Sequence, residues 1–502
     1  MSAGGRVVVV GGGLAGITAA LDCAAAGADV TLLEVRRRLG GAAYSFERDG
    51  LEMDNGQHVF LRCCLAYRAL LARLGSEHLI EVQPRLRIPV LKPGAAPFVL
   101  RRGRLPAPLQ LSGALARYPH LSARERAGAV RAALALMRGA RAGHRAAPER
   151  PGDDTLGQWL ARHGQGPRSI AALWDLIALP TLNIPAADAS LELGAFVFRR
   201  GLLDDAAAGD IGFHRGTLSQ IIAGPAARAL SRAGVDVRFG WRAERVQRTT
   251  RGFEVHGRAG RDARTAEQQP LGAALAPARA HAEGDDDGVA ADVVVVAVPH
   301  TRAARMLEGI LGEQARRLDG IGTSPIVNLH VVYDREVCDE HFAAGVGTPV
   351  QYLFDRSVAA GAPAGSQYLA VSLSGAEREM GMSVDALRER YLPALRELLP
   401  RTRQASVERF MVTREHAATF RATPGTAALR PGPATPVPRL VLAGAWTATG
   451  WPATLEGAVL SGHAAGAAAL RTLGLRRDGE PAATAASAAV AAVSAAGEGA
   501  RT

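Results

Sequence analysis

Residues 6–34 read RVVVVGGGLAGITAALDCAAAGADVTLLE, and this stretch decides the fold. The four consecutive valines at 7–10 predict a buried parallel strand, and a helix is expected over 14–26. A second strand over 29–33 leads to Glu34, whose carboxylate is placed to bind ribose hydroxyls and to repel a 2′-phosphate. Strand, helix, strand and terminal acid in this order are typical of a dinucleotide-binding βαβ unit.

Three glycines separate the first strand from the helix in the G-x-G-x-x-G spacing. Gly11 allows the tight turn, Gly13 lets the backbone approach a pyrophosphate, and Gly16 lets the helix lie close to the sheet. The helix then opens at Leu14 and Ala15, where free N–H groups and the positive end of the helix dipole face phosphates. A glycine-rich turn without a ligand is the alternative reading.

The bulk composition bounds the class of protein. A chain of 502 residues exceeds what one hydrophobic core serves, so two domains are expected. The net charge of +11 is carried almost entirely by arginine, which favours anionic partners such as phosphorylated ligands or a membrane surface. Nucleic acid is not expected, because aromatic residues make up only 5% and no nucleic-acid motif is present. An arginine-rich habit of the source genome would explain the same charge.

The four cysteines and the hydropathy pattern indicate the compartment. Cys63 and Cys64 are adjacent and suit neither a disulfide framework nor a zinc site, so no metal is expected. We expect no signal peptide, because the first strand begins at residue 6, and no run of about 18 apolar residues predicts a membrane span. A cytoplasmic protein fits these observations.

Residues 101–150 are unusually basic, with eleven arginines against two glutamates. Helical spacing over 124–141 places Val130, Leu134 and Met137 on one side, among arginines. A basic amphipathic helix of this kind can lie on an anionic membrane. The alternative is that its apolar side packs on its own domain and its arginines are only solvated.

Later segments complete an α/β fold. A second buried strand is predicted over 292–299, antiparallel strands over 326–333 and 368–374, a helix over 383–399, and a strand, glycine turn and helix over 439–470. We therefore predict a Rossmann-type domain with a mostly parallel sheet and a discontinuous α+β substrate domain with an antiparallel sheet. The predicted boundaries are 1–84, 208–320 and 436–476 for the nucleotide-binding domain, 85–207 and 321–435 for the substrate and membrane-facing domain, 262–291 for a flexible insertion, and 477–502 for a disordered tail.

This combination resembles the flavin amine oxidase and carotenoid desaturase superfamily, from about residue 5 to 475. The likeness rests on the first glycine turn, on the Arg36 to Gly41 turn after Glu34, and on the strand, turn and helix from Leu442 to Gly462. The resemblance implies FAD as the cofactor. It also implies that Val246 offers backbone hydrogen bonds to adenine and that the last helix points its N-terminus at the flavin ring.

The resemblance and the glycine turns together predict a set of cofactor contacts that lie at the two ends of the chain and on one strand between them. These residues are Gly11, Gly13, Leu14, Ala15, Gly16, Glu34, Arg36, Gly40, Gly41, Gly56, Gln57, Val246, Gly444, Ala445, Thr454 and Leu455. One departure stands out: the superfamily usually has an acidic residue at the position of Ala445, taken to bind the ribityl chain. We expect weaker FAD binding or another contact there.

Within the superfamily, DNGQHVFLRCC at 54–64 together with GWPATLEGA at 450–458 is most similar to the bacterial hydroxysqualene dehydroxylases. The resemblance implies reductive removal of the allylic hydroxyl of hydroxysqualene to give squalene in triterpenoid synthesis. The implied partners are a C30 isoprenoid, an anionic membrane surface at which a cytoplasmic enzyme docks peripherally, and an unknown electron donor. A carotenoid or phytoene desaturase, and a flavin-binding lipid carrier without turnover, remain alternatives.

Loss of a hydroxyl as water calls for a proton donor near the flavin. His58 is the first candidate, because its ring titrates near neutrality, although it can equally bond a backbone carbonyl and shape its loop. Asp54 can orient His58 or cap the helix that follows. Glu456, in the first turn of the last helix, can contact the ribityl chain or only complement the helix dipole.

Overall fold

The structure is a computed structural model that describes residues 4–141, 154–259 and 287–475. The predicted tail at 477–502 and most of the predicted insertion at 262–291 lie outside these residues. The end of that insertion is a correction, because β13 (Asp287–Ala291) pairs antiparallel with β12 (Phe253–Ala259). Val289 and Ala291 are buried, whereas the residues at 288 and 290 are exposed. This alternation is typical of a strand with one buried face, which explains why the segment joins a sheet.

A five-stranded sheet, parallel throughout, combines strands from the early and the late parts of the described chain. Its order is β10 (Asp236–Phe239), β2 (Asp29–Glu34), β1 (Arg6–Val10), β14 (Val293–Val296) and β20 (Leu440–Leu442). The predicted strands at 7–10, 29–33 and 292–299 are confirmed here, the last of them over Val293–Val296. Successive valines of β1 point to opposite faces and are all buried, because helices or strands cover both faces of the sheet.

Helices α1 (Leu14–Ala25) and α16 (Leu455–Leu473) pack against each other on one face of this sheet. Their approach is so close that a Cβ on Gly462 would lie 2.5 Å from the carbonyl oxygen of Ala15. The opposite face is covered by α10 (His300–Leu311) and by the antiparallel sheet of β11 (Trp241–Arg248), β12 and β13. The first and last helices are therefore held together as one layer.

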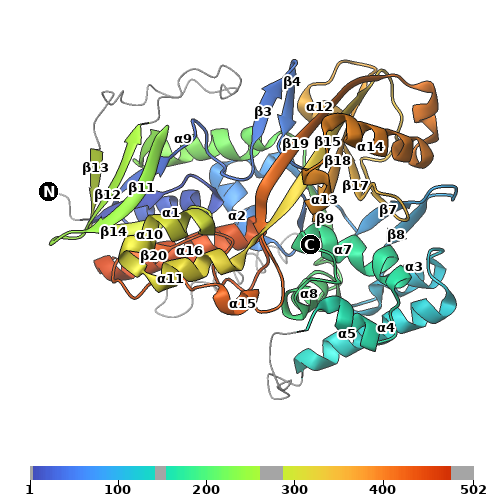
Figure 1. The fold of residues 1–502 in the computed structure, drawn as a ribbon, viewed down its shortest axis with the longest axis horizontal. Coiled ribbons are helices and arrows are strands. Elements are labelled where there is room, and N and C mark those ends of the chain that lie inside the picture. The colour runs from blue at the N-terminus through green and yellow to red at the C-terminus, as the bar shows by residue number, and fades with distance from the viewer. Residues whose placement is uncertain (1–3, 142–153, 260–286, 476–502) are drawn as a thin grey trace, which may run out of the picture.

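A seven-stranded mixed sheet forms the second large sheet. Its order is β19 (Val407–Phe420), β15 (Thr323–Tyr333), β18 (Gln367–Ser374), β17 (Tyr352–Asp355), β16 (Phe342–Gly345), β7 (Arg87–Leu91) and β8 (Phe98–Arg101). The long helix α14 (Val384–Leu398) packs on it. Figure 1 places this sheet and α14 at the end of the molecule opposite the sheet of β11, β12 and β13, with the helices of residues 112–198 below it. The fold is thus a Rossmann-type α/β unit joined to a mixed-sheet and helical unit, while the exact domain boundaries stay a prediction.

Small sheets connect the two large ones. β3 (Ser45–Arg48) pairs with β4 (Leu51–Asp54), and β9 (Ile211–His214) lies between β5 (Phe60–Leu61) and β6 (Ile80–Val82). The loop at 55–59 is therefore anchored by a strand at each end. The remaining α-helices are α2 (Leu65–Leu74), α3 (Ser112–Arg117), α4 (Ala123–Arg141), α5 (Leu156–Arg162), α6 (Pro167–Ser169), α7 (Asp175–Leu182), α8 (Leu191–Phe198), α9 (Gly224–Arg232), α11 (Glu313–Arg317), α12 (Ser357–Ala360), α13 (Glu377–Met380) and α15 (Thr426–Leu429).

Helix α4 forms where basic amphipathic spacing predicts it, but its buried side differs from the predicted apolar stripe. Ala129, Ala132 and Leu136 pack inward, whereas Val130 is 46% exposed and Leu134 is 37% exposed. The expectation that the stripe packs on its own domain is therefore wrong for these two side chains. Within the described part of the chain, no helix combines the length and apolar character needed to cross a bilayer.

Candidate functional site

The N-terminus of α1 is an open cradle of backbone groups. Gly13 is the N-cap residue and supplies no capping side chain, so the N–H groups of Leu14, Ala15 and Gly16 have no acceptor among the described residues. A Cβ on Gly16 would lie 1.9 Å from the carbonyl oxygen of Gly11, which explains why only glycine fits there. Three free donors at a helix N-terminus make a ready site for phosphate.

A second glycine turn closes the cradle from the other side. Gly40 donates to the Gly12 carbonyl at 2.9 Å and bridges to Gly13. A Cβ on Gly41 would lie 2.8 Å from the Gly13 Cα, and both Gly40 and Gly41 have positive φ angles. The two turns therefore meet without side chains between them, which leaves their backbone groups accessible to a pyrophosphate.

Glu34 is fixed at the end of β2 by backbone groups. Its Oε2 accepts from Gly12 N–H at 2.7 Å and its Oε1 from Arg36 N–H at 2.7 Å. Burial raises the pKa of this carboxyl, and the two hydrogen bonds oppose that rise. The acid thus stands beside the first glycine turn, where the βαβ pattern predicts it. Arg36 is exposed, and Val246 lies on β11, the outer strand of the three-stranded sheet.

The C-terminal turn presents a second helix N-terminus. Thr454 caps α16 by accepting from Gly457 N–H at 3.0 Å, which leaves Leu455 and Glu456 N–H without acceptors in the described chain. Gly444 has a φ of 138°, and a Cβ there would lie 2.4 Å from Nε1 of Trp446. This turn therefore needs glycine as much as the first one does.

A buried arginine that the sequence did not single out organises this turn. Arg430 is 6% exposed and donates to the carbonyls of Ala445, Thr447 and Trp451 at 3.2, 2.6 and 2.7 Å. Burial lowers its pKa to about 10, and its guanidinium lies 4.5 Å from the ring centroid of Phe420. Where Ala445 replaces the usual acid, the structure thus has a cation held by main-chain oxygens.

Asp54 is the centre of a buried network rather than a free acid. Its Oδ2 accepts from Arg356 at 2.9 Å, and its Oδ1 accepts from Ser45 Oγ at 2.7 Å and Leu218 N–H at 2.9 Å. Asp54 and Arg356 are 5% and 8% exposed. Asp54 was expected to orient His58 or to cap the helix that follows, but its hydrogen bonds in the described chain go to Arg356, Ser45 and the backbone N–H of Leu218, at the start of a later helical stretch.

His58 is held by its own loop and by a second histidine. Its Nδ1 lies 3.0 Å from the Gly56 carbonyl, which can only accept, so the neutral ring carries its proton on Nδ1. His214 Nδ1 donates to the His58 carbonyl at 2.8 Å, and Tyr67 Oη donates to His214 Nε2 at 2.8 Å. Nε2 of His58 has no hydrogen-bond partner among the described residues, so it is the one free nitrogen of the pair.

Burial sets the charge of both histidines. Desolvation lowers the pKa of His58, although Asp54 and the Gly56 carbonyl oppose it. Desolvation and the charges of His58 and Arg356 lower the pKa of His214 to about 3. His214 is therefore a neutral positioning group at physiological pH, and His58 is neutral there but gives up a proton easily when charged.

Glu456 caps α2, a helix that lies far earlier in the chain. Its Oε1 and Oε2 accept from Ala66 and Tyr67 N–H at 3.0 and 2.7 Å, in the first turn of α2. Burial raises the pKa of this carboxyl, and these backbone hydrogen bonds oppose the rise. From the sequence, a contact with the ribityl chain and a role at the dipole of its own helix were both open for Glu456; in the structure both of its carboxylate oxygens bind the N-terminus of α2.

Two unpartnered polar atoms mark where a ligand fits. Asn328 donates to the Asn55 carbonyl at 3.0 Å, which fixes its amide and leaves Oδ1 buried without a donor. Its Nδ2 would lie 3.1 Å from a Cβ on Gly56, and the neighbouring Gln57 has a buried Nε2 without an acceptor. A flavin ring carries both N–H donors and carbonyl acceptors, so these residues suit it.

Glycine turns at two helix N-termini, an acid at the end of β2 and open amide groups beside His58 define a dinucleotide-dependent oxidoreductase. The chain matches the family described as flavin containing amine oxidoreductase over residues 14–470 and belongs to it. The enzyme is an FAD-dependent oxidoreductase, and the prediction of FAD is confirmed.

Individual relatives refine this placement. The chain is 29% identical to a hydroxysqualene dehydroxylase of Rhodopseudomonas palustris over 91% of this chain and 97% of that one. It is 24% identical to the hydroxysqualene dehydroxylase of Zymomonas mobilis over 92% and 98%. Among solved structures, cyclohexylamine oxidase from Brevibacterium oxydans has a TM-score of 0.65 at 17% identity, covering 93% of this chain and 99% of that one. The last likeness shows the fold alone.

Proposed function

We propose that this enzyme removes the allylic hydroxyl of hydroxysqualene reductively and produces squalene. The observation that carries the proposal is similarity over nearly the full length of both chains to relatives named hydroxysqualene dehydroxylase. Carotenoid and phytoene desaturases match at 23–24% identity over most of this chain, or at higher identity over short stretches only. The desaturase alternative is therefore kept as an outcome of the test.

We assign FAD binding to the two glycine turns, Glu34, the β11 edge at Val246 and the N-terminus of α16. In the reaction, the carbon–oxygen bond breaks, a carbon–hydrogen bond forms, and the oxygen leaves as water after taking one proton. Reduced FAD, when bound, supplies the hydride. The residues of this chain must orient the alcohol, exclude water and hold the proton.

His58 is the proposed proton donor. Protonated His58 would keep Nδ1–H on the Gly56 carbonyl and carry the second proton on Nε2, the nitrogen without a partner. Its lowered pKa makes that imidazolium a stronger acid than an exposed histidine. Asp54 and Glu456 act as positioning residues, because their oxygens already accept from Arg356, Ser45 and backbone N–H groups.

A C30 hydrocarbon partitions into lipid, since burial of each CH₂ gains about 0.8 kcal/mol. We propose that the enzyme docks peripherally on the cytoplasmic membrane through its basic segment. In support, exposed Val130 and Leu134 lie on α4 beside the exposed Arg131 and Arg138.

The test is a single anaerobic turnover. Purified protein loaded with FAD and reduced with dithionite is incubated with hydroxysqualene, and the products are identified by mass spectrometry. Squalene is expected. Intact, reduced holoenzyme that yields no squalene but forms conjugated polyene from phytoene would favour a desaturase, and tight lipid binding with neither product would favour a carrier.

The His58→Gln variant tests the proton donor. We expect it to retain FAD and to lose roughly 10²–10⁴-fold in rate, the usual range for general acid catalysis. His78→Gln is the matched control, because His78 is exposed on the surface. A His58→Gln variant as fast as His78→Gln would remove His58 from the mechanism.

A further inference from the structure

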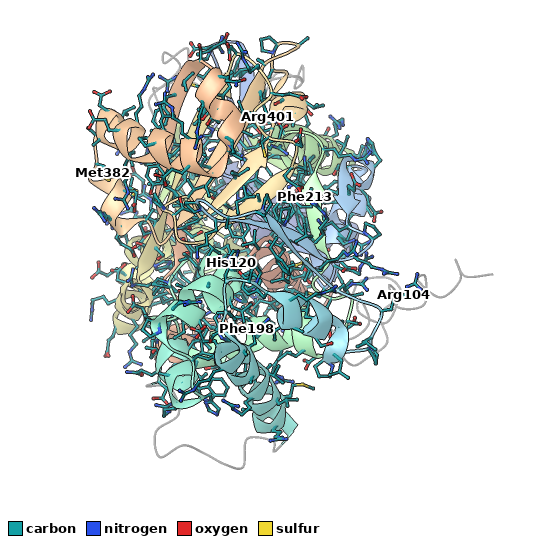
Figure 2. All side chains as sticks on the ribbon, turned by 90° about the vertical axis from the view of Figure 1, so that its right-hand side faces the viewer. Arg104, His120, Phe198, Phe213, Met382 and Arg401 are labelled. Carbon is teal, nitrogen blue, oxygen red and sulfur yellow. The ribbon has the colours of Figure 1, made fainter. Side chains whose placement is uncertain are left out.

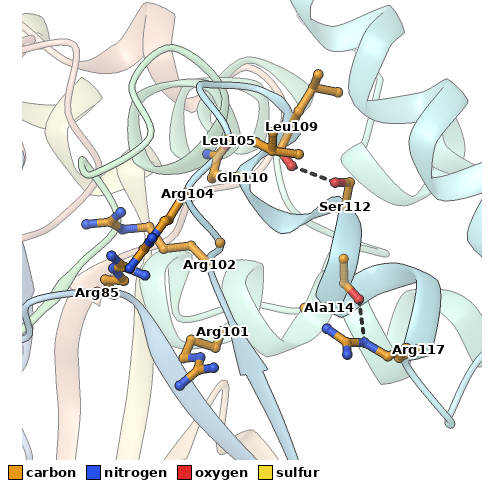
Figure 3. Close-up of a pocket in the computed structure, with 12 residues that line it drawn as sticks. Arg85, Arg101, Arg102, Arg104, Leu105, Leu109, Gln110, Ser112, Ala114 and Arg117 are labelled. Atoms are coloured by element: carbon orange, nitrogen blue, oxygen red, sulfur yellow. Dashed lines mark hydrogen bonds between the residues drawn. The ribbon is translucent and has the colours of Figure 1, made fainter.

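A hollow of about 240 Å³ opens between the end of β8, the segment after it and α3. Five of its lining residues are basic and none is acidic. The basic residues are Arg85, Arg101, Arg102, Arg104 and Arg117. Figure 2 shows Arg104 at the margin of the molecule, and Figure 3 shows the arginines around the hollow.

Most of this charge is uncompensated. Arg102 is paired with Asp210 at 2.6 Å, and Arg117 donates to the Gly113 carbonyl at 3.1 Å. The side chains of Arg85, Arg101 and Arg104 are exposed and have neither an ion-pair nor a hydrogen-bond partner within the described ranges. Several like charges that line one hollow repel each other unless an anion lies among them.

Two large apolar side chains stand at the same hollow. Leu105 and Leu109 are each 52% exposed, and Figure 3 shows them together on one side, with Arg101 and Arg117 on the other. A binding site for a free anion gains nothing from exposed leucines. An anion that is attached to an apolar phase accounts for both kinds of side chain.

A buried amide adds an independent sign of a ligand. Gln110 lines the hollow, is 3% exposed, and its Oε1 has no donor. Its Nε2 donates to the Leu202 carbonyl, which can only accept, so the amide cannot be turned to satisfy Oε1. A ligand that brings a hydroxyl donor next to its phosphate would satisfy this oxygen.

We propose that this hollow binds the headgroup of an anionic phospholipid, with the phosphate among the arginines and Leu105 and Leu109 inserted into the acyl region. The proposal rests on the proposed function insofar as a lipid-borne substrate requires docking. Phosphatidylglycerol is the probe that fits, because its headgroup combines a phosphodiester with hydroxyl donors. The surface would hold the enzyme on the membrane from which it takes its substrate.

The test is flotation of the full-length holoenzyme with phosphatidylcholine vesicles, with and without phosphatidylglycerol. The Arg101→Glu/Arg104→Glu variant is expected to bind the anionic vesicles at least about tenfold more weakly. The matched control is Arg378→Glu/Arg388→Glu, which makes the same change in net charge at exposed arginines on α13 and α14. Leu105→Ser/Leu109→Ser should also weaken binding, whereas Val358→Ser, at a side chain that is 94% exposed, should not.

Three results would overturn the proposal. The first is equal loss of binding in the two arginine double variants, which indicates a net-charge effect only. The second is displacement by inorganic phosphate with no effect of the leucine variants, which indicates a site for a soluble anion. The third is no vesicle binding at all, as expected if the surface meets an acidic protein instead. Turnover of detergent-dispersed substrate is measured in parallel, so failure of docking is distinguished from failure of the proposed reaction.

Discussion

The nucleotide cradle and the His58 loop are built in opposite ways. The cradle is made by residues between Gly11 and Gly41, which contact one another through backbone atoms and the Glu34 carboxylate, with Ala297 as a distant neighbour of Gly11. The His58 loop is held by Arg356, His214 and other side chains from far along the chain. Spacing in the sequence therefore determines the first region, whereas only the completed fold assembles the second.

The two regions also differ in which groups remain open. In the cradle, backbone donors at the N-terminus of α1 lack acceptors, so the site is ready for an anion. Around the His58 loop most polar side chains are satisfied by protein groups, and the exceptions are Nε2 of His58, Gln57 and Asn328. The chemistry of the second region is thus confined to a few atoms within a rigid frame.

Among the changes considered for these two regions, removal of Arg356 should lower the free energy of unfolding most. Arg356→Met leaves Asp54 buried without its cation and takes hydrogen bonds from the His214 and Gly216 carbonyls. Loss of one partner of a buried ion pair typically costs about 3–5 kcal/mol of the free energy of unfolding. Urea denaturation of the apoprotein measures this cost.

Arg335→Met is the control for that measurement. Arg335 pairs with Asp334 at 3.0 Å on the surface, where an ion pair contributes only about 0–1 kcal/mol. The second variant, Asp54→Leu/Arg356→Met, should be more stable than Arg356→Met alone, because it removes the uncompensated charge. If Arg356→Met lowers the free energy of unfolding no more than Arg335→Met does, the structure around the His58 loop does not depend on the Asp54–Arg356 pair.

The cradle is tested by Gly16→Ala. The added Cβ meets the Gly11 carbonyl, a backbone atom that cannot move without shifting the turn. We expect a loss of about 1–3 kcal/mol in the free energy of unfolding, together with a clear loss of retained FAD. Gly309→Ala on α10 is the matched control: nothing lies within 4 Å of its Cβ position, so it should gain about 0.5–1 kcal/mol. Full FAD retention in Gly16→Ala would contradict the local account.

The sequence predicted most of the first region and little of the second. Consecutive valines and glycine spacing gave β1, α1, β2 and the place of Glu34 correctly, because each depends on neighbours in the chain. The parallel pairing of Val90 with Ala344 has no local signal, since it joins two segments far apart in the chain. Arg356 and Arg430 look like any other arginine in an arginine-rich chain, and only their burial distinguishes them.

The pH dependence of the rate is a smaller expected effect, and the lowered pKa of His58 determines its direction. The pKa of His58 is lowered, so the protonated form needed for proton donation falls about tenfold per pH unit above that pKa, equivalent to about 1.4 kcal/mol. The value of kcat/KM should therefore rise as the pH falls toward and below 6.5, the ordinary value for histidine. His58→Gln should make the profile flat in this range.

As the pH falls, the free energy of unfolding should decrease while kcat/KM increases. Burial lowers the pKa of His330 to about 4 and that of His214 to about 3, so both are neutral in the folded protein. The unfolded chain takes up their protons near pH 6.5, hence their contribution to stability is present above that pH and is lost as the pH falls toward 4 and 3. Initial rates must be paired with circular dichroism at each pH. A rate that falls with decreasing pH while the fold is intact would contradict proton donation by His58.

Glu456→Gln should have the smallest effect, and it tests whether a residue that supports the fold around His58 also takes part in the reaction. The amide keeps one oxygen to accept from the first turn of α2 but turns an NH₂ group toward the second N–H, and it removes the negative charge at the N-terminus of that helix. We expect a loss of about 1 kcal/mol in the free energy of unfolding and an unchanged pH profile, since the carboxylate serves α2 and not the reacting oxygen. Glu389→Gln, at an exposed position on α14, should change neither quantity. A shifted pH profile in Glu456→Gln would mean that this carboxylate exchanges protons during turnover. A residue that joins distant parts of the chain would then take part in the reaction as well as in holding the fold.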